Sequence, residues 1–139
     1  MIAIDTSVLV RYVTQDDPDQ SRRANALFET GLSEQVPGYV TLVTLAEFHW
    51  VLSRKYAAPP TRIADAVREL LAAPTIVVEQ AEVVESALAE GLGGFADCLV
   101  HYAALAAGCS KTVTFDRKFA RIAGVERLEA TDSLPQPPV

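Results

Sequence analysis

The sequence predicts a single α/β domain in which helices cover both faces of a parallel sheet, and three observations indicate this fold class. Short apolar segments alternate along the chain with longer segments whose apolar residues recur at helical spacing. The short segments are apolar throughout, which is typical of parallel strands that are covered on both faces. Half of the 139 residues are hydrophobic, and a chain of this length buries roughly two-thirds of its unfolded surface, enough for a core without disulfides.

Five short apolar segments are the expected strands, at residues 1–4, 36–40, 75–78, 111–115 and 125–128. One helix is expected directly after Asp5, and others at residues 19–32, 41–56, 61 onward, 81–90, 96–107 and 117–123. Gly31 suits the end of a helix, and the prolines at 59 and 60 suit the beginning of one. A glycine-rich loop is expected at 91–94 and a proline-rich, flexible tail at 134–139, so the domain is predicted to span residues 1–133.

Composition argues against several classes of protein. No apolar run approaches the ~18 residues that span a bilayer. The N-terminus has no basic leader and places Asp5 within its apolar stretch, unlike a signal peptide. Two cysteines, Cys98 and Cys109, are expected on one helix as buried thiols, because their spacing is too wide for a disulfide. These features predict a cytoplasmic protein.

The net charge of −6 argues against general affinity for nucleic acid, which depends on clustered Lys and Arg. The acidic excess is uneven, because residues 73–110 contain five acidic side chains and no Lys or Arg. Basic residues such as Arg11, Arg54 and Lys55 remain available for a local basic surface. The charge therefore argues against indiscriminate binding of nucleic acid but leaves a local binding surface open.

Four acidic residues are notable for their positions. Asp5 ends the first expected strand and Asp116 follows the fourth, and ligands of parallel sheets bind beyond the carboxyl ends of the strands. Glu47 and Asp97 are single acids within apolar helical segments, where an unpaired buried carboxylate is costly. If the four converge, a divalent cation relieves their repulsion, and oxygen ligands favour Mg²⁺ or Mn²⁺ over zinc. The structural alternative is that each Asp caps a helix and that Glu47 pairs with an Arg.

The sequence around these acids resembles the PIN-domain nucleases, and specifically the VapC-type toxins of bacterial toxin–antitoxin modules. The resemblance covers residue 1 to about residue 130. It rests on four motifs in matching order and spacing: Ile4-Asp5-Thr6-Ser7-Val8-Leu9-Val10, Thr44-Leu45-Ala46-Glu47-Phe48, Ala96-Asp97-Cys98-Leu99-Val100 and Val113-Thr114-Phe115-Asp116-Arg117-Lys118-Phe119. It implies a metal-dependent endoribonuclease on a central, roughly five-stranded parallel sheet. The expected reaction is hydrolysis of an RNA phosphodiester by metal-activated water.

The resemblance also assigns roles to individual residues. The acids that would hold Mg²⁺ or Mn²⁺ and act in catalysis are Asp5, Glu47, Asp97 and Asp116. Thr6, Ser7 and Thr114 lie where the family has small hydroxyl residues beside this cluster, with an ordinary strand residue as the alternative for Thr114. Arg11, near the first motif, is a candidate contact for RNA or for an antitoxin. Members of the family typically form homodimers and are held inactive by a cognate antitoxin.

Four further residues are assessed against the same pattern. Lys118 stands where many relatives have an additional acid, which leaves the number of metals open. His101 follows Asp97 by four residues, a possible metal-ligand spacing, although a lone helical histidine is more often structural. His49 is expected to point away from Glu47 on the same helix. Trp50 is expected in the core or in a dimer interface rather than as a base-stacking platform.

Other function classes fit the sequence less well. A receiver-like signalling module requires an aspartate at the end of the third strand, where this chain has Val78 and Glu79. A phosphohydrolase with an aspartyl nucleophile usually has Asp-x-Asp at the first strand, where Ser7 occupies the second position. An inactive, binding-only PIN relative is disfavoured because all four acids are present, but this alternative stays open.

Overall fold

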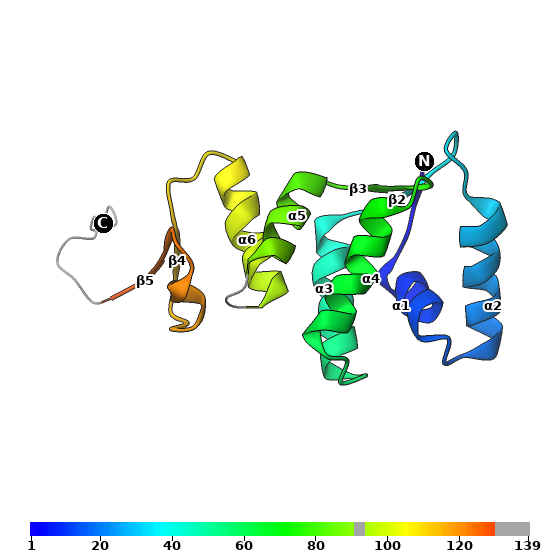
Figure 1. Cartoon of the computed structure of the whole chain (residues 1–139), viewed down its shortest axis with the longest axis horizontal. Helices are drawn as coiled ribbons and strands as arrows, with labels where there is room; N and C mark the ends of the chain where they lie inside the picture. The colour runs from blue at the N-terminus through cyan, green and yellow to red at the C-terminus, as the bar shows by residue number, and fades with distance from the viewer. Residues whose placement is uncertain (91–93, 130–139) are drawn as a thin grey trace, which may run out of the picture.

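The structure is a computed structural model that describes residues 1–90 and 94–129 (Figure 1). It confirms the α/β class. The elements in chain order are β1 (Ile2–Ala3), α1 (Thr6–Thr14), α2 (Pro18–Ala26), the π-helical turn η1 (Leu27–Gly31), β2 (Gly38–Val40), α3 (Leu42–Arg54), α4 (Pro60–Ala72), β3 (Ile76–Val78), α5 (Ala81–Ala89), α6 (Phe95–Ala106), β4 (Thr112–Thr114), the 3₁₀ turn η2 (Phe119–Arg121) and β5 (Val125–Arg127). Of the loop expected at 91–94 only Gly94 is described. The expected tail at 134–139 and the domain end at residue 133 lie outside the described residues.

The strands form two parallel sheets instead of one. The first has the order β1-β2-β3, with Ile2 opposite Gly38 and Gly38 opposite Ile76. The second pairs β4 with β5, with Thr112 opposite Val125. The expectation of a single five-stranded central sheet is therefore wrong. The reason lies in α6, which packs against α5 and α3 and leads the chain into β4 on the side of these helices away from β1 (Figure 1).

The helices bury one face each, as their apolar spacing predicts. Leu9 of α1, Leu45 and Phe48 of α3, and Val67 of α4 are completely buried in a shared core. Burial of each such side chain contributes about 1.5–3 kcal/mol relative to an exposed position. This packing holds α1 against α3. In the chain, α1 follows β1 and α3 follows β2.

The helix expected at residues 19–32 begins at Pro18, with Asp17 as its N-cap, and changes to a π-helical turn at Leu27. The Asp17 side chain accepts a hydrogen bond from the backbone N–H of Gln20 at 3.0 Å. Phe28 in the π turn stacks on Tyr12 of α1, with ring centroids 4.2 Å apart. The aromatic contact therefore fastens the end of this segment to α1.

His101 fastens the second sheet to α6. Its side chain is buried, with Nδ1 2.8 Å from Thr112 Oγ1 and Nε2 3.2 Å from the Ala123 carbonyl oxygen. Gly124 has a φ of 87°, and a Cβ built there would lie 3.1 Å from the imidazole Cε1. The imidazole thus fills a space that glycine leaves open. Both nitrogens contact the protein, which supports the structural alternative for His101 over metal binding.

The two cysteines differ in environment. Cys98 in α6 is buried, and burial, with a smaller contribution from the charges of Glu90 and Asp97, raises the pKa of its thiol to about 11. Cys109 follows the end of α6 and is exposed, so the expectation of two buried thiols on one helix is wrong for Cys109. Within the described ranges, no helix is long and apolar enough to cross a membrane.

Candidate active site

Asp5 is held in place by the first turn of α1. It is the N-cap of this helix, and its Oδ2 accepts hydrogen bonds from the Ser7 hydroxyl at 2.8 Å and the Ser7 backbone N–H at 3.3 Å. These bonds, the hydroxyl bond first, lower the pKa of the Asp5 carboxyl below its usual value. Both bonds end at Oδ2, so they do not occupy Oδ1. The capping role expected as an alternative is therefore present, and it orients the carboxylate without using all of its oxygen atoms.

Glu47 lies with Asp5 in the lining of a pocket of about 360 Å³ between α1 and α3. The complete lining is Asp5, Thr6, Ser7, Val10, Arg11, Glu47, Val51, Lys55 and Tyr56. The expectation that Glu47 occupies a core-facing position is wrong, because its side chain is exposed. Leu45, Phe48 and Leu52 take the buried face of α3, and Glu47 stands at the solvent-facing edge of that face. Because the Glu47 carboxylate is exposed, it does not lose its hydration, and the cost that suggested a buried Arg partner does not arise.

Asp97 and Asp116 form a second acidic pair. Asp97 lies half-buried in the first turn of α6, and burial, followed by the negative charge of Asp116, raises the pKa of its carboxyl. His49 of α3 has the opposite, smaller effect on this pKa. Asp116 Oδ1 accepts backbone N–H bonds from Lys118 at 2.8 Å and Phe119 at 3.1 Å, so Asp116 caps the turn that leads into η2. Oδ2 takes part in neither bond.

The described residues relate the four acids in two sets: Asp5 and Glu47 line one pocket, and the charge of Asp116 acts on Asp97. Across residues 1–90 and 94–129, no group of three or more His, Cys, Asp or Glu side chains is arranged to hold a metal ion. The physical reason is the division of the sheet: Asp5 follows β1 and Asp116 follows β4, and these strands belong to different sheets. Convergence of all four acids on one ion therefore stays a prediction.

The predicted hydroxyl residues lie beside the acids. Ser7 donates to Asp5, and Thr114 Oγ1 accepts the backbone N–H of Asp116 at 3.1 Å. Thr6 is 6% exposed, and its Oγ1 has no hydrogen-bond partner among the described residues. Thr6 and Ser7 also line the pocket that contains Asp5 and Glu47. Ser7 and Thr114 therefore contact the carboxyl and the backbone, respectively, of the acids beside them.

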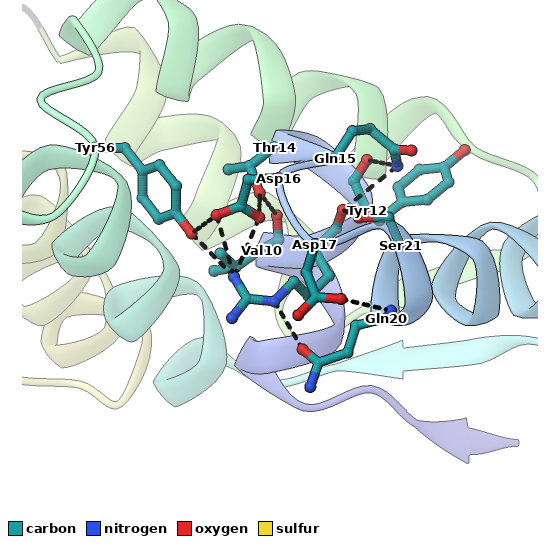
Figure 2. A network of polar contacts seen from close by, with 10 residues as sticks. Val10, Tyr12, Thr14, Gln15, Asp16, Asp17, Gln20, Ser21 and Tyr56 are labelled. Carbon is teal, nitrogen blue, oxygen red and sulfur yellow. Dashed lines mark hydrogen bonds and ion pairs between the residues drawn. The ribbon is translucent and has the colours of Figure 1, made fainter.

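Arg11 is already engaged within the protein, through partners that include Asp16, Gln20 and Tyr56, which Figure 2 labels. Its Nε donates to Gln20 Oε1 at 2.7 Å, and its terminal nitrogen lies 3.2 Å from Asp16 Oδ1 and 3.0 Å from the Tyr56 hydroxyl. The Tyr56 bond is the main cause that raises the pKa of Arg11. A direct contact of Arg11 with RNA or antitoxin stays a prediction, but its main observed role is to join α1 to the residues after α3.

Sequence reasoning named Lys55 only as part of a local basic surface and missed Tyr56, and both residues line the same pocket. A signal for Lys55 was present, because Glu47, Val51 and Lys55 are spaced four residues apart and share one side of a helix. No local signal identified Tyr56, whose partners Arg11 and Asp16 are 45 and 40 residues away in the chain.

Three other residues differ from expectation or extend it. Trp50 is 55% exposed with the Arg54 guanidinium 4.1 Å from its ring centroid, so the core alternative is wrong and the dimer-interface alternative stays a prediction. His49 is half-buried, which lowers the pKa of its imidazole, and Asp97 opposes this effect. His49 Nδ1 has no hydrogen-bond partner in the described part of the chain. Lys118 is exposed and contacts Asp116 through its backbone N–H.

The donor set suits a hard divalent cation. Each pair supplies carboxylate oxygens, and Mg²⁺ is commonly held by one or two carboxylates together with water and substrate phosphates. The capping bonds of Asp5 and Asp116 leave a second oxygen on each carboxylate for such an ion. Asp97 and Asp116 repel each other, and a cation between carboxylates removes that repulsion. Each of the two sets of carboxylates therefore suits a divalent cation.

Comparison with known proteins agrees with this chemistry. Residues 2–125 match the PIN domain, which covers both acidic pairs. No curated protein matches the sequence. PIN domains are in general metal-dependent nucleases. Since the match extends over most of the chain, this protein belongs to the PIN-domain family.

Proposed function

We propose that this protein is a metal-dependent endoribonuclease and the VapC-type toxin of a type II toxin–antitoxin module. The observation that carries the proposal is the pocket between α1 and α3, in which Asp5 and Glu47 lie together and Ser7 orients Asp5. The pair Asp97 and Asp116 supports it, because carboxylates close enough to repel each other suit a cation.

The residues proposed to hold Mg²⁺ or Mn²⁺ are Asp5, Glu47, Asp97 and Asp116. When bound, the metal would lower the pKa of a water ligand and stabilise negative charge on the scissile phosphate. The chain itself orients the ligands. Ser7 holds one oxygen of Asp5, and the backbone N–H groups of Lys118 and Phe119 hold one oxygen of Asp116. Ligands that are fixed before the metal binds lose less freedom when it arrives.

RNA as the substrate, and the toxin role, rest on the resemblance of the four acidic motifs to VapC-type toxins. Inhibition by a cognate antitoxin and assembly as a homodimer belong to the same proposal. Exposed apolar side chains support a protein interface, since Val43, Trp50 and Val100 each expose more than half of their surface on α3 and α6.

The test is cleavage of RNA by the purified chain in Mg²⁺ or Mn²⁺ and in EDTA. We expect cleavage that requires the metal and that Asp5→Asn or Asp97→Asn reduces at least a hundredfold. Asp65→Asn is the matched control, because Asp65 is an exposed acid on α4 that pairs only with Arg68 among the described residues. Cleavage that persists in EDTA would contradict the metal mechanism.

The toxin role has a separate test. Expression of the chain alone in bacteria is expected to arrest growth, and Asp5→Asn is expected to abolish the arrest. Equal toxicity of both proteins, or growth unaffected by a chain that cleaves RNA in vitro, would contradict the toxin assignment. A chain that binds RNA without cleaving it would support the inactive relative instead.

A further inference from the structure

The pocket between α1 and α3 is lined by side chains of both charges. Asp5 and Glu47 are the acidic residues of its lining, and Arg11 and Lys55 are the basic ones. Glu47 and Lys55 lie on α3 and at its C-cap, eight residues apart, which corresponds to about 12 Å along a helix axis. Lys55 is therefore about two helical turns beyond Glu47 in the lining of the same surface depression.

The two basic residues differ in what they already contact. The Arg11 guanidinium bonds to Gln20, Asp16 and Tyr56. For the Lys55 ammonium, no hydrogen bond or ion pair is found with any residue in the described ranges, and its side chain is exposed. An ammonium group has three donors and binds phosphate as a point charge. Lys55 is thus the cation of this pocket whose donors are available to a ligand.

We propose, resting on the ribonuclease function above, that Lys55 binds a backbone phosphate of the RNA strand that neighbours the phosphate cut at the acids. Phosphate contacts position a nucleic acid and set its register on the protein without reading its sequence. Arg11 and Tyr56 line the pocket with Lys55, and both bond to Asp16, which ties the end of α1 to the residues after α3. Lys55 is a positioning residue for RNA and takes no part in the hydrolysis itself.

This role predicts a dependence on substrate length. A dinucleotide has one phosphodiester. When that phosphate lies at the acids, the dinucleotide has no second phosphate to contact Lys55. A longer single strand reaches from the acids to Lys55, so a second phosphate can contact the Lys55 ammonium. Lys55→Gln should therefore raise KM for a long RNA about threefold to tenfold, leave kcat for that RNA nearly unchanged, and leave dinucleotide cleavage unchanged.

The decisive measurement is the salt dependence of binding, which is independent of catalysis. A fluorescent, single-stranded oligoribonucleotide is titrated with the protein in EDTA at several salt concentrations. Loss of one phosphate contact should reduce the slope of log K against log salt by about 0.7 for Lys55→Gln. Lys55→Arg should restore the slope because it keeps the charge. Arg62→Gln, an exposed basic residue on α4 that lines a different pocket, is the matched control.

A purely structural role for Lys55, such as favourable charge at the end of α3, would change the melting temperature and not the salt slope. An unchanged slope for Lys55→Gln, an equal fall for Arg62→Gln, or no RNA binding at all would overturn the proposal. RNA binding with a Lys55-dependent slope but without metal-dependent cleavage would instead contradict the ribonuclease function. The two failures are therefore distinguishable.

Discussion

The hydroxyl of Tyr56 donates a 2.6 Å hydrogen bond to Asp16 Oδ2 across 40 residues of sequence. Tyr56 follows α3 and Asp16 follows α1, and Arg11 contacts both partners. Helix α3 carries Glu47, and α1 begins directly after Asp5. The Tyr56–Asp16 contact therefore joins the two helices that present these acids to the pocket. Figure 2 shows Asp16 between Tyr56 and Thr14, whose hydroxyl donates to Asp16 Oδ1 at 2.7 Å.

Removing the Tyr56 hydroxyl should loosen this contact without creating a large cavity. We expect Tyr56→Phe to lower the midpoint of urea unfolding and to raise KM for RNA, because α1 and α3 lose a direct connection beside the pocket. Tyr12→Phe is the control, since Tyr12 packs on Phe28 through its ring, which phenylalanine retains. Equal effects of the two substitutions would show that the Asp16 contact is not responsible.

The same contact predicts a dependence of stability on pH. Hydrogen bonds from Tyr56 and Thr14, and then the charge of Arg11, lower the pKa of Asp16 in the folded protein. The folded state therefore binds fewer protons than the unfolded state, in which the Asp pKa is about 3.9. The stabilisation is present above that value and is lost as the pH falls through the lower folded pKa. Urea unfolding between neutral pH and about pH 3 should show a smaller acid-side loss for Asp16→Asn than for the wild type.

Ser7 should control the affinity of the site for its metal. Ser7→Ala removes the 2.8 Å bond that orients Asp5 but retains the Asp5 carboxyl. Loss of a group that orients a ligand typically reduces metal affinity or activity about 10- to 100-fold. The measurement is the Mn²⁺ concentration required for half-maximal RNA cleavage. Ser53→Ala is the control, because Ser53 bonds only to the Trp50 carbonyl on α3 among the described residues. An unchanged Mn²⁺ requirement would remove the orienting role.

His101 should be a determinant of stability. His101→Ala leaves a cavity and removes the contacts with Thr112 and the Ala123 carbonyl, so we expect a loss of about 3 kcal/mol in the free energy of unfolding. Hydrogen exchange should rise most in β4 and β5, which His101 fastens to α6. A metal-ligand role would instead leave stability intact and change the metal requirement. His49→Ala is the comparison, because His49 is only half-buried.

The two cysteines should differ in reactivity. A thiol reagent at mildly alkaline pH should modify Cys109 quickly and Cys98 only on unfolding, because Cys109 is exposed and Cys98 is 1% exposed. Mass spectrometry after a short exposure distinguishes the two sites. Rapid modification of both would show that α6 opens readily in solution.

Local sequence signals predicted most elements because their causes are local. Apolar spacing and capping residues predicted the ends of the helices to within a few residues. Helix α3, expected at 41–56, begins after its N-cap Thr41 and ends at Arg54. The short helix expected at 117–123 is a three-residue 3₁₀ turn, because the backbone is already extended at Ile122 and enters β5 at Val125. The exposure of Glu47 was missed because apolar neighbours in sequence do not reveal which side of α3 the other elements cover.

The fold class, the four acids and the motifs of the PIN-domain family could all be predicted from the amino-acid sequence. These depend on residue identity and spacing. Long-range packing, by contrast, places Asp5 and Glu47 in one pocket and Asp116 near Asp97, and it engages Arg11 with Asp16 and Tyr56 while Lys55 stays available. Those relationships depend on how α6 packs against α3 and α5 and on the division of the strands into two sheets. Such contacts join residues far apart in the chain, and local periodicity contains no information about them.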